Sequence, residues 1–202
     1  MDTNADTGLV ALPADAPVWG NVFLVAPLVL VGTKEEDGSY DLAPKHMAMP
    51  LGWENRYCFV CTPRHATYGN ALREGAFTVS FPRPDQVLQT GLAAGGRTPE
   101  GRKPALTALP TFPATAVDGV LVQGCALFLE CELERMVDGF GDASLVVGRV
   151  VAAHADPAVV REPERDDGEL LHESPHLAYL SPGRFASIAE SYSFPFPADL
   201  HL

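Results

Sequence analysis

A run of small residues interrupted by one lysine and one histidine is the first stretch that could form a binding loop. It spans Ala43–Met49, with Lys45 and His46 at its centre. Small residues let a backbone approach a planar ring closely, and backbone N–H groups can then bond to heteroatoms of that ring. Lys45, His46 and these amides would favour a ligand that carries negative charge. The ordinary alternatives are that Lys45 is a solvated surface residue and that His46 has only a structural role in a turn.

A second stretch, Thr62–Thr67, combines hydroxyl, guanidinium and imidazole groups just before a predicted helix. The N-terminus of a helix presents free backbone N–H groups and the positive end of the helix dipole, which together suit a phosphate. Arg64 and His65 would add charge-assisted hydrogen bonds, although surface charge explains them equally well. By themselves the two stretches indicate a phosphorylated ligand and nothing more specific.

Short apolar runs separated by turn residues must position these stretches. With 18 Gly and 18 Pro in 202 residues, the pattern is typical of many strands and few helices. We expect strands over residues 22–33, 40–43, 56–62, 76–81, 120–138 (bent or bulged at Gln123-Gly124) and 144–156. We expect a helix over 66–75, with Thr67 as its N-cap and Gly75 after its last turn, and a second short helix near 87–92. Residues 157–175 are expected to form an exposed loop. The pattern predicts a mainly β fold, a barrel or sandwich in one domain (20–202) that follows an N-terminal arm (1–19).

The charge balance and the cysteines limit the class of protein. The net charge is −12, which argues against partners with a phosphate backbone and against anionic membrane surfaces. The longest apolar run, Val22–Gly32, is far shorter than the roughly 20 residues of a membrane-spanning helix, and the N-terminus lacks the basic residues of a secretory signal. Four cysteines without framework spacing fit a reducing compartment, so we expect a cytoplasmic protein. Cys58 and Cys61 have no second Cys-x-x-Cys, and we expect buried thiols rather than metal ligands.

Several short motifs occur in a fixed order from about Val22 to Phe185. They are the turn Asp41–Pro44, the loop Lys45–Met49, the strand end Cys61–Thr67, the segment Asn70–Ser80, the strand Gly141–Val150 and the tail His176–Phe185. In this order they resemble the flavin-reductase-like family, whose fold is the FMN-binding split barrel. The resemblance implies a split β-barrel with a few short helices. His46 stands where many members carry Ser or Thr, and Ala143 rather than His follows Asp142.

The resemblance also implies a homodimer with flavin at or near the subunit interface. The residues that it assigns to the flavin are Ala43, Lys45, His46, Met47 and Ala48 around the ring system, and Cys61, Thr62, Arg64, His65, Ala66 and Thr67 around the ribityl phosphate. His176 and Arg184, with Tyr179, are expected on the substrate side, against the nicotinamide. The expected cofactor is FMN, with FAD as the alternative, and the expected reductant is NADH or NADPH.

The resulting hypothesis is an NAD(P)H-dependent flavin reductase in which hydride passes from nicotinamide to flavin. The reduced flavin or its electrons would then go to a partner such as a flavin-dependent oxygenase. Because flavin supplies the chemistry, no side chain is assigned a catalytic role. Two alternatives stay open: an FMN-binding electron carrier without nicotinamide turnover, and a ligand-sensing or structural β-barrel that has lost the cofactor. No metal site, nucleic-acid partner or membrane partner is expected.

Overall fold

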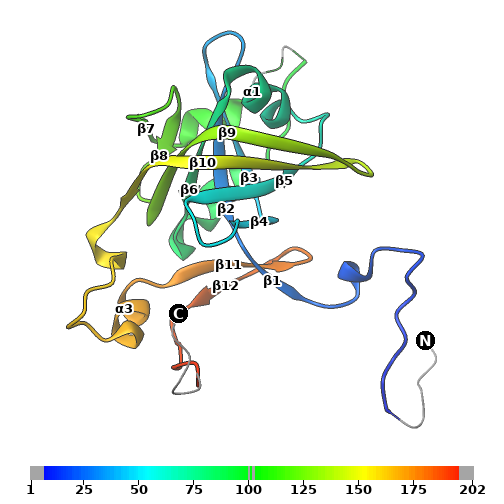
Figure 1. Cartoon of the computed structure of the whole chain (residues 1–202), viewed down its shortest axis with the longest axis vertical. Coiled ribbons are helices and arrows are strands. Elements are labelled where there is room, and N and C mark those ends of the chain that lie inside the picture. Colours follow the sequence, from blue (N-terminus) through cyan, green and yellow to red (C-terminus); the bar gives the residue numbers. More distant parts are fainter. Residues whose placement is uncertain (1–6, 100, 102, 196–202) are drawn as a thin grey trace.

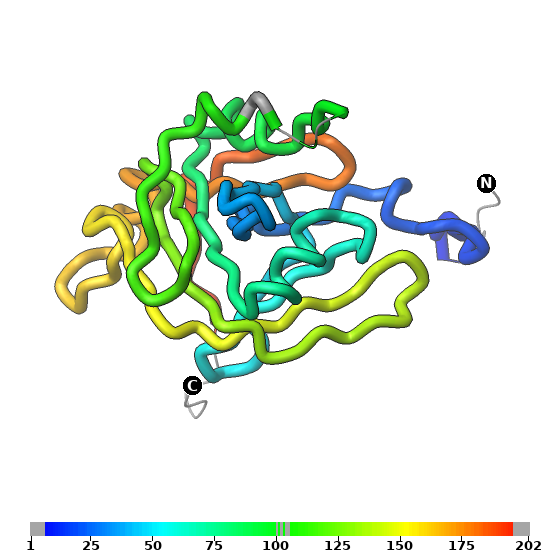
Figure 2. The backbone as a smooth tube through the Cα atoms, turned by 90° about the horizontal axis from the view of Figure 1, so that it is seen from above, coloured from blue at the N-terminus to red at the C-terminus, as the bar shows by residue number. Residues whose placement is uncertain are grey.

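Seven strands form the main sheet in the computed structural model, which describes residues 7–99, 101 and 103–195. In spatial order they are β3 (Tyr40–Lys45), β2 (Val29–Lys34), β6 (Ala76–Phe81), β9 (Leu127–Phe140), β10 (Ala143–Ala155), β5 (Arg56–Cys61) and β4 (Ala48–Pro50). All neighbouring pairs in this sheet are antiparallel. The sheet curls into a half-barrel, which Figures 1 and 2 show from the side and from above. The expected mainly β, split-barrel fold is confirmed.

Smaller elements surround this sheet. A second sheet has the order β1 (Leu24–Pro27), β11 (His176–Ser181) and β12 (Arg184–Ile188), and β7 (Thr111–Pro113) pairs with β8 (Val120–Val122). The α-helices of the described residues are α1 (Ala66–Glu74), α2 (Val87–Leu92) and α3 (Asp167–Glu173). Short 3-10 turns lie at Val18–Gly20, Pro84–Gln86, Pro104–Ala108 and Pro157–Val159. No helix in the described part of the chain is long and apolar enough to cross a membrane.

Buried side chains form two core clusters, one with Val29 and Val31 of β2 and the other with Leu30 of the same strand, so both faces of the main sheet are covered. β-branched and aromatic residues suit such a pleated, buried surface. Val31 of β2 and Val79 of β6 are partners across these strands, and both are fully buried. The rings of Phe59 and Phe77 pack edge to face, with their centroids 5.1 Å apart. A Cβ atom on Gly148 of β10 would lie 2.5 Å from the Phe77 ring, so glycine lets β10 pass this close. Gly148 belongs to the Gly141–Val150 motif, which therefore has a packing function.

The stretch 22–33 forms two strands rather than the single one expected. β1 and β2 belong to different sheets, and the chain changes sheet directly after Pro27, which has no N–H to donate to a ladder. The hairpin predicted after this stretch is confirmed. The backbone N–H of Glu35 donates to the carbonyl of Ser39 over 2.7 Å.

Helix α1 confirms one predicted cap and corrects the other. Gly75 has φ = 66°, in the left-handed region, and its N–H donates to the carbonyl of Ala71 over 3.0 Å, as expected of a residue that ends a helix. The N-cap is His65 rather than Thr67, and Thr67 is buried in the first turn.

One further expectation is refined and one needs correction. The stretch 120–138 divides at Gln123-Gly124, where the sequence indicated a bent or bulged pair, but its two strands, β8 and β9, lie in different sheets and are separated by a turn in which Gly124 has φ = 80°. The stretch 157–175 contains α3 in addition to loop, because the carboxylate of Asp166 caps this helix and accepts hydrogen bonds from the N–H groups of Gly168 (2.9 Å) and Glu169 (3.0 Å). The helix expected near 87–92 is α2.

The end of the 87–119 segment, which sequence patterns did not place, is fixed by a buried acid. The carboxylate of Glu130 is fully buried and accepts hydrogen bonds from the backbone N–H groups of Thr115 (2.9 Å), Ala116 (2.5 Å) and Val117 (3.2 Å). Burial alone would raise the pKa of Glu130, but these donors outweigh it and lower the pKa below its ordinary value. The segment is therefore tied to β9 at this end.

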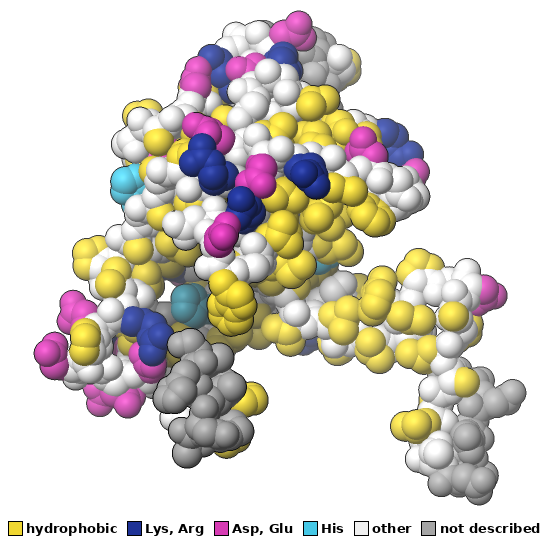
Figure 3. Space-filling model, in the orientation of Figure 1, with side chains coloured by type: hydrophobic (Ala, Val, Ile, Leu, Met, Phe, Trp, Pro, Cys, Tyr) yellow, Lys and Arg dark blue, Asp and Glu magenta, His cyan; other side chains and the backbone are white. Residues whose placement is uncertain are grey.

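The N-terminal part of the described chain projects from the body as an apolar arm (Figures 1 and 3). Its exposed large apolar side chains are Leu9, Val10, Leu12, Trp19, Val22 and Phe23. The arm leads into β1, which lies at the edge of its sheet and, among the described strands, pairs with β11 alone. An apolar segment next to an open strand edge is a place where another chain can pack and pair.

Candidate functional site

The two loops singled out in the sequence meet at one cavity of about 630 Å³. We call it the cation-lined cavity. Its lining residues are Asp41, Ala43, Pro44 and Lys45 of β3, Arg64–Thr67 at the start of α1, Ala93–Arg97, and Lys103. Four Lys and Arg side chains and one His face a single acid here, although the chain as a whole has a net charge of −12. The cavity is therefore suited to an anion.

The N-terminus of α1 supplies main-chain donors to this cavity. His65, Ala66 and Thr67 lie at the N-terminus of the helix, whose first N–H groups have no carbonyl partner within the helix. No side chain of the N-cap residue bonds to them. Together with the helix dipole, these donors favour a phosphate-like group.

A buried acid holds the far wall of the cavity in place. The Asp41 side chain is 3% exposed, and its two oxygens lie 2.9 Å from Lys103 Nζ and 3.1 Å from Arg97 Nη2. Lys103 Nζ also donates to the carbonyls of Leu42 (2.9 Å) and Ala93 (3.1 Å). These bonds tie Ala93, Arg97 and Lys103 to β3, so residues 93–97 and Lys103 form a wall of the site.

Sequence patterns missed this wall. Asp41, Arg97 and Lys103 were not among the predicted site residues, and their contact joins residues far apart along the chain. One signal was present: Arg97, Arg102 and Lys103 form a basic cluster in an otherwise acidic chain. Such a cluster is unusual enough to mark a position that neutralises a buried or bound anion.

Lys45 differs from its neighbours in having no acidic partner. Ten of the thirteen Lys and Arg residues in the described chain form ion pairs, and the exceptions there are Lys45, Arg135 and Arg184. Lys45 Nζ instead lies 3.4 Å from Cys61 Sγ. An unpaired ammonium in an acidic protein is available to a ligand. The surface-residue alternative does not describe Lys45, which is partly buried in the cavity wall.

His65 and His46 are both held in the neutral form. Partial burial and the cations Lys45, Arg64 and Lys103 lower the pKa of His65 below 6.5. Burial and Lys45 lower the pKa of His46 in the same way. At neutral pH each ring can therefore both donate and accept a hydrogen bond.

A second cavity of about 340 Å³ adjoins the first and shares Pro44 and Ala94 with it. We call it the aromatic cavity. The rings of His46 and Tyr179 lie 4.7 Å apart, centroid to centroid, at 39°. Its other lining residues are Leu28, Val87, Thr90, Gly91, Gly183, Arg184 and Phe185. Figure 2 shows why these residues meet, because the segment after α2 runs beside the hairpin of β11 and β12.

Most of the predicted site residues converge on these two cavities. Ala43, Lys45, Arg64, His65, Ala66 and Thr67 line the first, and His46 and Arg184 line the second. Cys61 is buried in the core beneath Lys45, and Thr62 contributes its carbonyl, which accepts the N–H of His65 over 2.9 Å. All four cysteines are buried and free, as expected of thiols that pack as small apolar groups.

Three predicted residues lie elsewhere. Met47, between β3 and β4, is 55% exposed and lines neither cavity. Ala48 is buried beside a third, apolar cavity with Tyr57 and Val150. His176 lines a separate cavity beside α3 and does not join Arg184.

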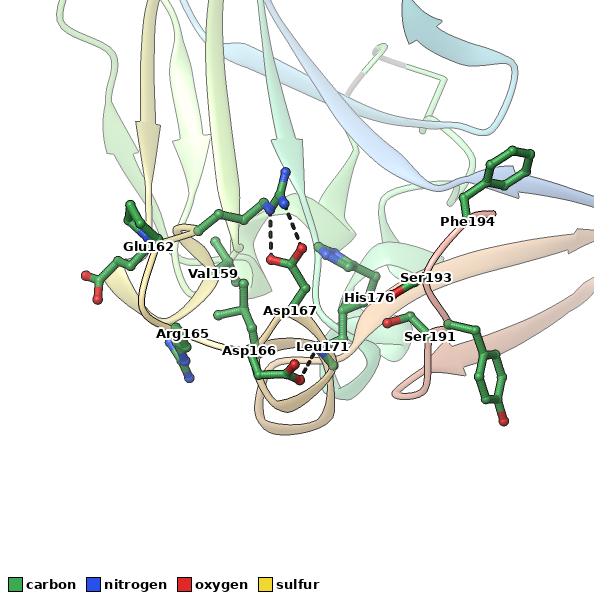
Figure 4. A pocket seen from close by; sticks show the side chains of 15 residues that line it. Val159, Glu162, Arg165, Asp166, Asp167, Leu171, His176, Ser191, Ser193 and Phe194 are labelled. Atoms are coloured by element: carbon green, nitrogen blue, oxygen red, sulfur yellow. Dashed lines mark hydrogen bonds and ion pairs between the residues drawn. The ribbon is translucent and has the colours of Figure 1, made fainter. Parts of the chain in front are cut away.

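The cavity beside α3, about 930 Å³, is larger than the cation-lined and aromatic cavities, but both of its arginines are already paired (Figure 4). Arg161 bonds Asp167 with both nitrogens that face it, at 2.9 and 2.6 Å. Arg165 pairs with Glu173 at 2.5 Å, and Asp166 caps α3. These contacts give its charged side chains structural roles at the surface.

Comparisons with known proteins identify the family and the fold. Residues 23–181 match the family model for the flavin reductase like domain. A 2-nitrobenzoate 2-nitroreductase from Pseudomonas fluorescens has a similar structure, with a TM-score of 0.78 and 17% identity over 100% of this chain and 99% of that chain. Nitrilotriacetate monooxygenase component B from Bacillus cereus also has a similar structure, with a TM-score of 0.78 and 20% identity over 95% of this chain and 100% of that chain. Flavoredoxin of Desulfovibrio vulgaris has a similar structure as well, with a TM-score of 0.75 and 19% identity over 94% of this chain and 99% of that chain. At these identities the three structures show a shared fold.

Proposed function

Because this chain belongs to the flavin reductase like domain family, we propose that it is an NAD(P)H-dependent flavin reductase that binds FMN in the cation-lined cavity. Family membership supports the coarser description, a flavin-related oxidoreductase with a flavin cofactor. The choice of FMN, the nicotinamide reductant and the residues that hold the flavin are the finer parts of the proposal.

The observation that carries the proposal is the concentration of positive charge at the N-terminus of α1. Lys45 contributes a cation without an acidic partner among the described residues, and Arg64 contributes a guanidinium that also pairs with Asp142 at the surface (3.0 Å). His65 and Thr67 contribute hydrogen-bonding side chains, and the first turn of α1 contributes N–H groups. This donor set fits the phosphate of FMN. Ala43, Ala66 and residues 93–96, which are all Ala or Gly, leave the rest of the cavity free of bulky side chains, as a flat ring system requires.

The protein has to bind and orient the cofactor, because a bound flavin supplies the hydride and electron chemistry. Lys45 is the cation best placed to favour negative charge on a ligand, since it lacks an acidic partner of its own. Neutral His46 can donate a hydrogen bond without adding charge. The aromatic cavity next to it leaves room for a second planar molecule, and we assign the reductant or acceptor to this space.

We also propose a homodimer in which the arm, residues 1–19, extends from the domain formed by 20–202. Trp19 of the arm and Phe23 and Val25 directly after it are exposed, and β1 has an open edge among the described strands. Packing of these residues against a second copy would remove them from water. The predicted recipient of the reduced flavin is a flavin-dependent oxygenase, and component B of a monooxygenase is among the proteins of similar fold.

An absorption spectrum of the purified protein, recorded before and after addition of FMN and then of NADH or NADPH without oxygen, tests the proposal. We expect a yellow protein whose colour bleaches with the nicotinamide. A yellow protein that stays oxidised would favour the electron carrier, a function consistent with the flavoredoxin fold. A protein that FMN neither colours nor raises in Tm would contradict the flavin site itself.

Variants test the assignment of the phosphate. His65→Ala combined with Thr67→Ala should weaken FMN binding and change riboflavin binding much less, because riboflavin lacks the phosphate. Arg135→Gln is the matched control, since Arg135 is exposed, is also unpaired among the described residues and lines neither cavity. Unchanged FMN affinity in the double variant would remove the phosphate from this loop.

A further inference from the structure

Arg184 stands out because the described residues give it no acidic partner. It lines the aromatic cavity, where no Asp or Glu is among the lining residues. Asp and Glu outnumber Lys and Arg by 26 to 14 in this chain, so most cations find a partner. Of the three unpaired cations in the described chain, Lys45 lines the cation-lined cavity, Arg184 lines the adjoining cavity, and Arg135 lies on β9 away from both.

The wall beside Arg184 is a fixed aromatic surface. The Tyr179 ring stacks at a tilt on His46, and its hydroxyl accepts the backbone N–H of Gly183 over 2.8 Å. Phe185 is the cross-strand partner of Tyr179 and contributes to the same cavity. Held in this way, the surface loses little conformational entropy when a flat molecule binds against it.

The remaining walls decide the kind of molecule. Leu28, Val87 and Pro44 are apolar, and a cavity of about 340 Å³ suits a ligand of about one ring. A guanidinium presents two parallel N–H donors, which match the oxyanion of a carboxylate or phosphate. The shared chemistry is thus an aromatic ring that carries an oxyanion, and the small, apolar space favours a carboxylate on the ring over the phosphate of a long nucleotide.

We infer that the aromatic cavity binds an aromatic carboxylate, with Arg184 as the residue that recognises its carboxylate and Tyr179 as the surface on which its ring packs. This inference rests on the proposed function, because it names the class of the second substrate at the same site. Arg184 is a specificity-determining residue in this scheme, and it selects charged aromatic molecules over neutral ones of the same shape.

Calorimetric titration of the FMN-loaded, oxidised protein tests the inference with three probes. Benzoate carries both features, benzamide carries the ring without the charge, and acetate carries the charge without the ring. We expect benzoate to bind at least tenfold more tightly than either of the others. Arg184→Gln should remove this preference and leave benzamide binding as it was, whereas Arg135→Gln should retain the preference. Tyr179→Leu should weaken benzoate and benzamide together.

Two results would overturn the inference. The first is benzamide binding as tightly as benzoate, and the second is unchanged benzoate binding in Arg184→Gln. A rise of KM for NADPH but not for NADH in Arg184→Gln, with benzoate binding intact, would assign the guanidinium to the nucleotide phosphate instead. Arg184 is exposed near the turn of a hairpin, so the variant should fold, and its Tm provides the check.

Loading with FMN separates the inference from the function on which it rests. Failure to take up FMN would contradict the proposed function. Uptake of FMN without any preference for benzoate would contradict the aromatic-carboxylate assignment alone.

Discussion

The cation-lined cavity and the cavity beside α3 are both polar, but they differ in what their charges already bind. Beside α3, Arg161 and Asp167 neutralise one another at the surface. Among the described residues of the cation-lined cavity, Lys45 has no acidic partner, and the single acid, Asp41, holds the wall. The cavity beside α3 has the larger volume, about 930 against 630 Å³, yet the smaller one has donors left over for a ligand.

Because of this difference, we select the candidate binding site by charges that lack a partner rather than by volume. A charge that is paired and solvated has little to gain from a ligand. A cation kept partly buried without a partner carries a desolvation cost that a bound anion can offset. Pairing, not burial, distinguishes Arg184 from Arg165: Arg184 is exposed and has no ion-pair partner among the described residues, whereas Arg165 is paired with Glu173.

Replacement of the acid that holds the wall should have the largest effect. Asp41→Asn removes a carboxylate that is 3% exposed and leaves Lys103, whose side chain is 11% exposed, without its counter-ion. Loss of one partner of a buried ion pair costs about 3 kcal/mol, so the free energy of unfolding should fall by about that amount in urea titration. FMN affinity should fall as well, because residues 93–103 lose their attachment to β3.

A loss of less than about 1 kcal/mol would contradict this account, because it would mean that Asp41 behaves as an exposed acid does. The order in which a protease cuts the chain offers a second check. Limited proteolysis of the variant should begin in residues 93–103 before the rest of the chain is cut, since these residues depend on Asp41 for their position.

Removal of the unpaired cation Lys45 should have the second largest effect. Lys45→Gln takes away a charge-assisted contact to the ligand, and FMN should bind about tenfold more weakly. The difference in affinity between FMN and riboflavin should become smaller in the variant if Lys45 contacts the phosphate. It should stay constant if Lys45 contacts the ring. Arg161→Gln in the cavity beside α3 is the matched control, and an equal loss there would mean that net charge alone governs binding.

The sequence was informative where the site is built from neighbouring residues. The small-residue stretch and the stretch before α1 are local signals, and they located the walls that β3 and α1 contribute. The wall at 93–103 was missed because Arg97 and Lys103 meet Asp41 only through the tertiary fold. Helix α3 was missed because it is short and its main signal is the capping carboxylate of Asp166.

Strand boundaries failed for a related reason. A continuous apolar run does not show where a chain passes from one sheet to another. Only the turn residues Pro27 and Gly124 marked those points, and each was read as part of a strand or a bulge. Met47 was assigned to the flavin by its place in a motif; it is exposed and lines neither cavity, so this assignment stays a prediction.

Proton uptake should reveal whether His65 meets the anion. Burial and three cations lower the pKa of His65 below 6.5 in the free protein, and a bound phosphate would raise it. FMN binding near pH 6.5 should therefore take up a fraction of a proton, which calorimetry in buffers of different ionisation enthalpy measures. Riboflavin should give no uptake, and His65→Gln should remove it. Equal proton uptake on binding of FMN and of riboflavin would place His65 away from the phosphate.

The same lowered pKa has a consequence for stability. Because the unfolded chain binds a proton at His65 more readily than the folded one, stability should decrease as the pH falls through 6.5. FMN should reduce this decrease, because it brings the pKa of the folded state closer to that of the unfolded state.

The smallest effect is expected beside α3. Asp167→Asn breaks an ion pair whose two side chains are 77% and 56% exposed, so water replaces each contact at little cost. We expect no change in FMN affinity and a Tm that differs from the parent's by less than the scatter between preparations. A clear fall in Tm would show that this pair stabilises the region around α3, and the contrast with Asp41 would then rest on burial alone. A clear fall in FMN affinity would be more damaging, because it would mean that the paired cavity also contributes to flavin binding and that unmet charge does not separate the two regions.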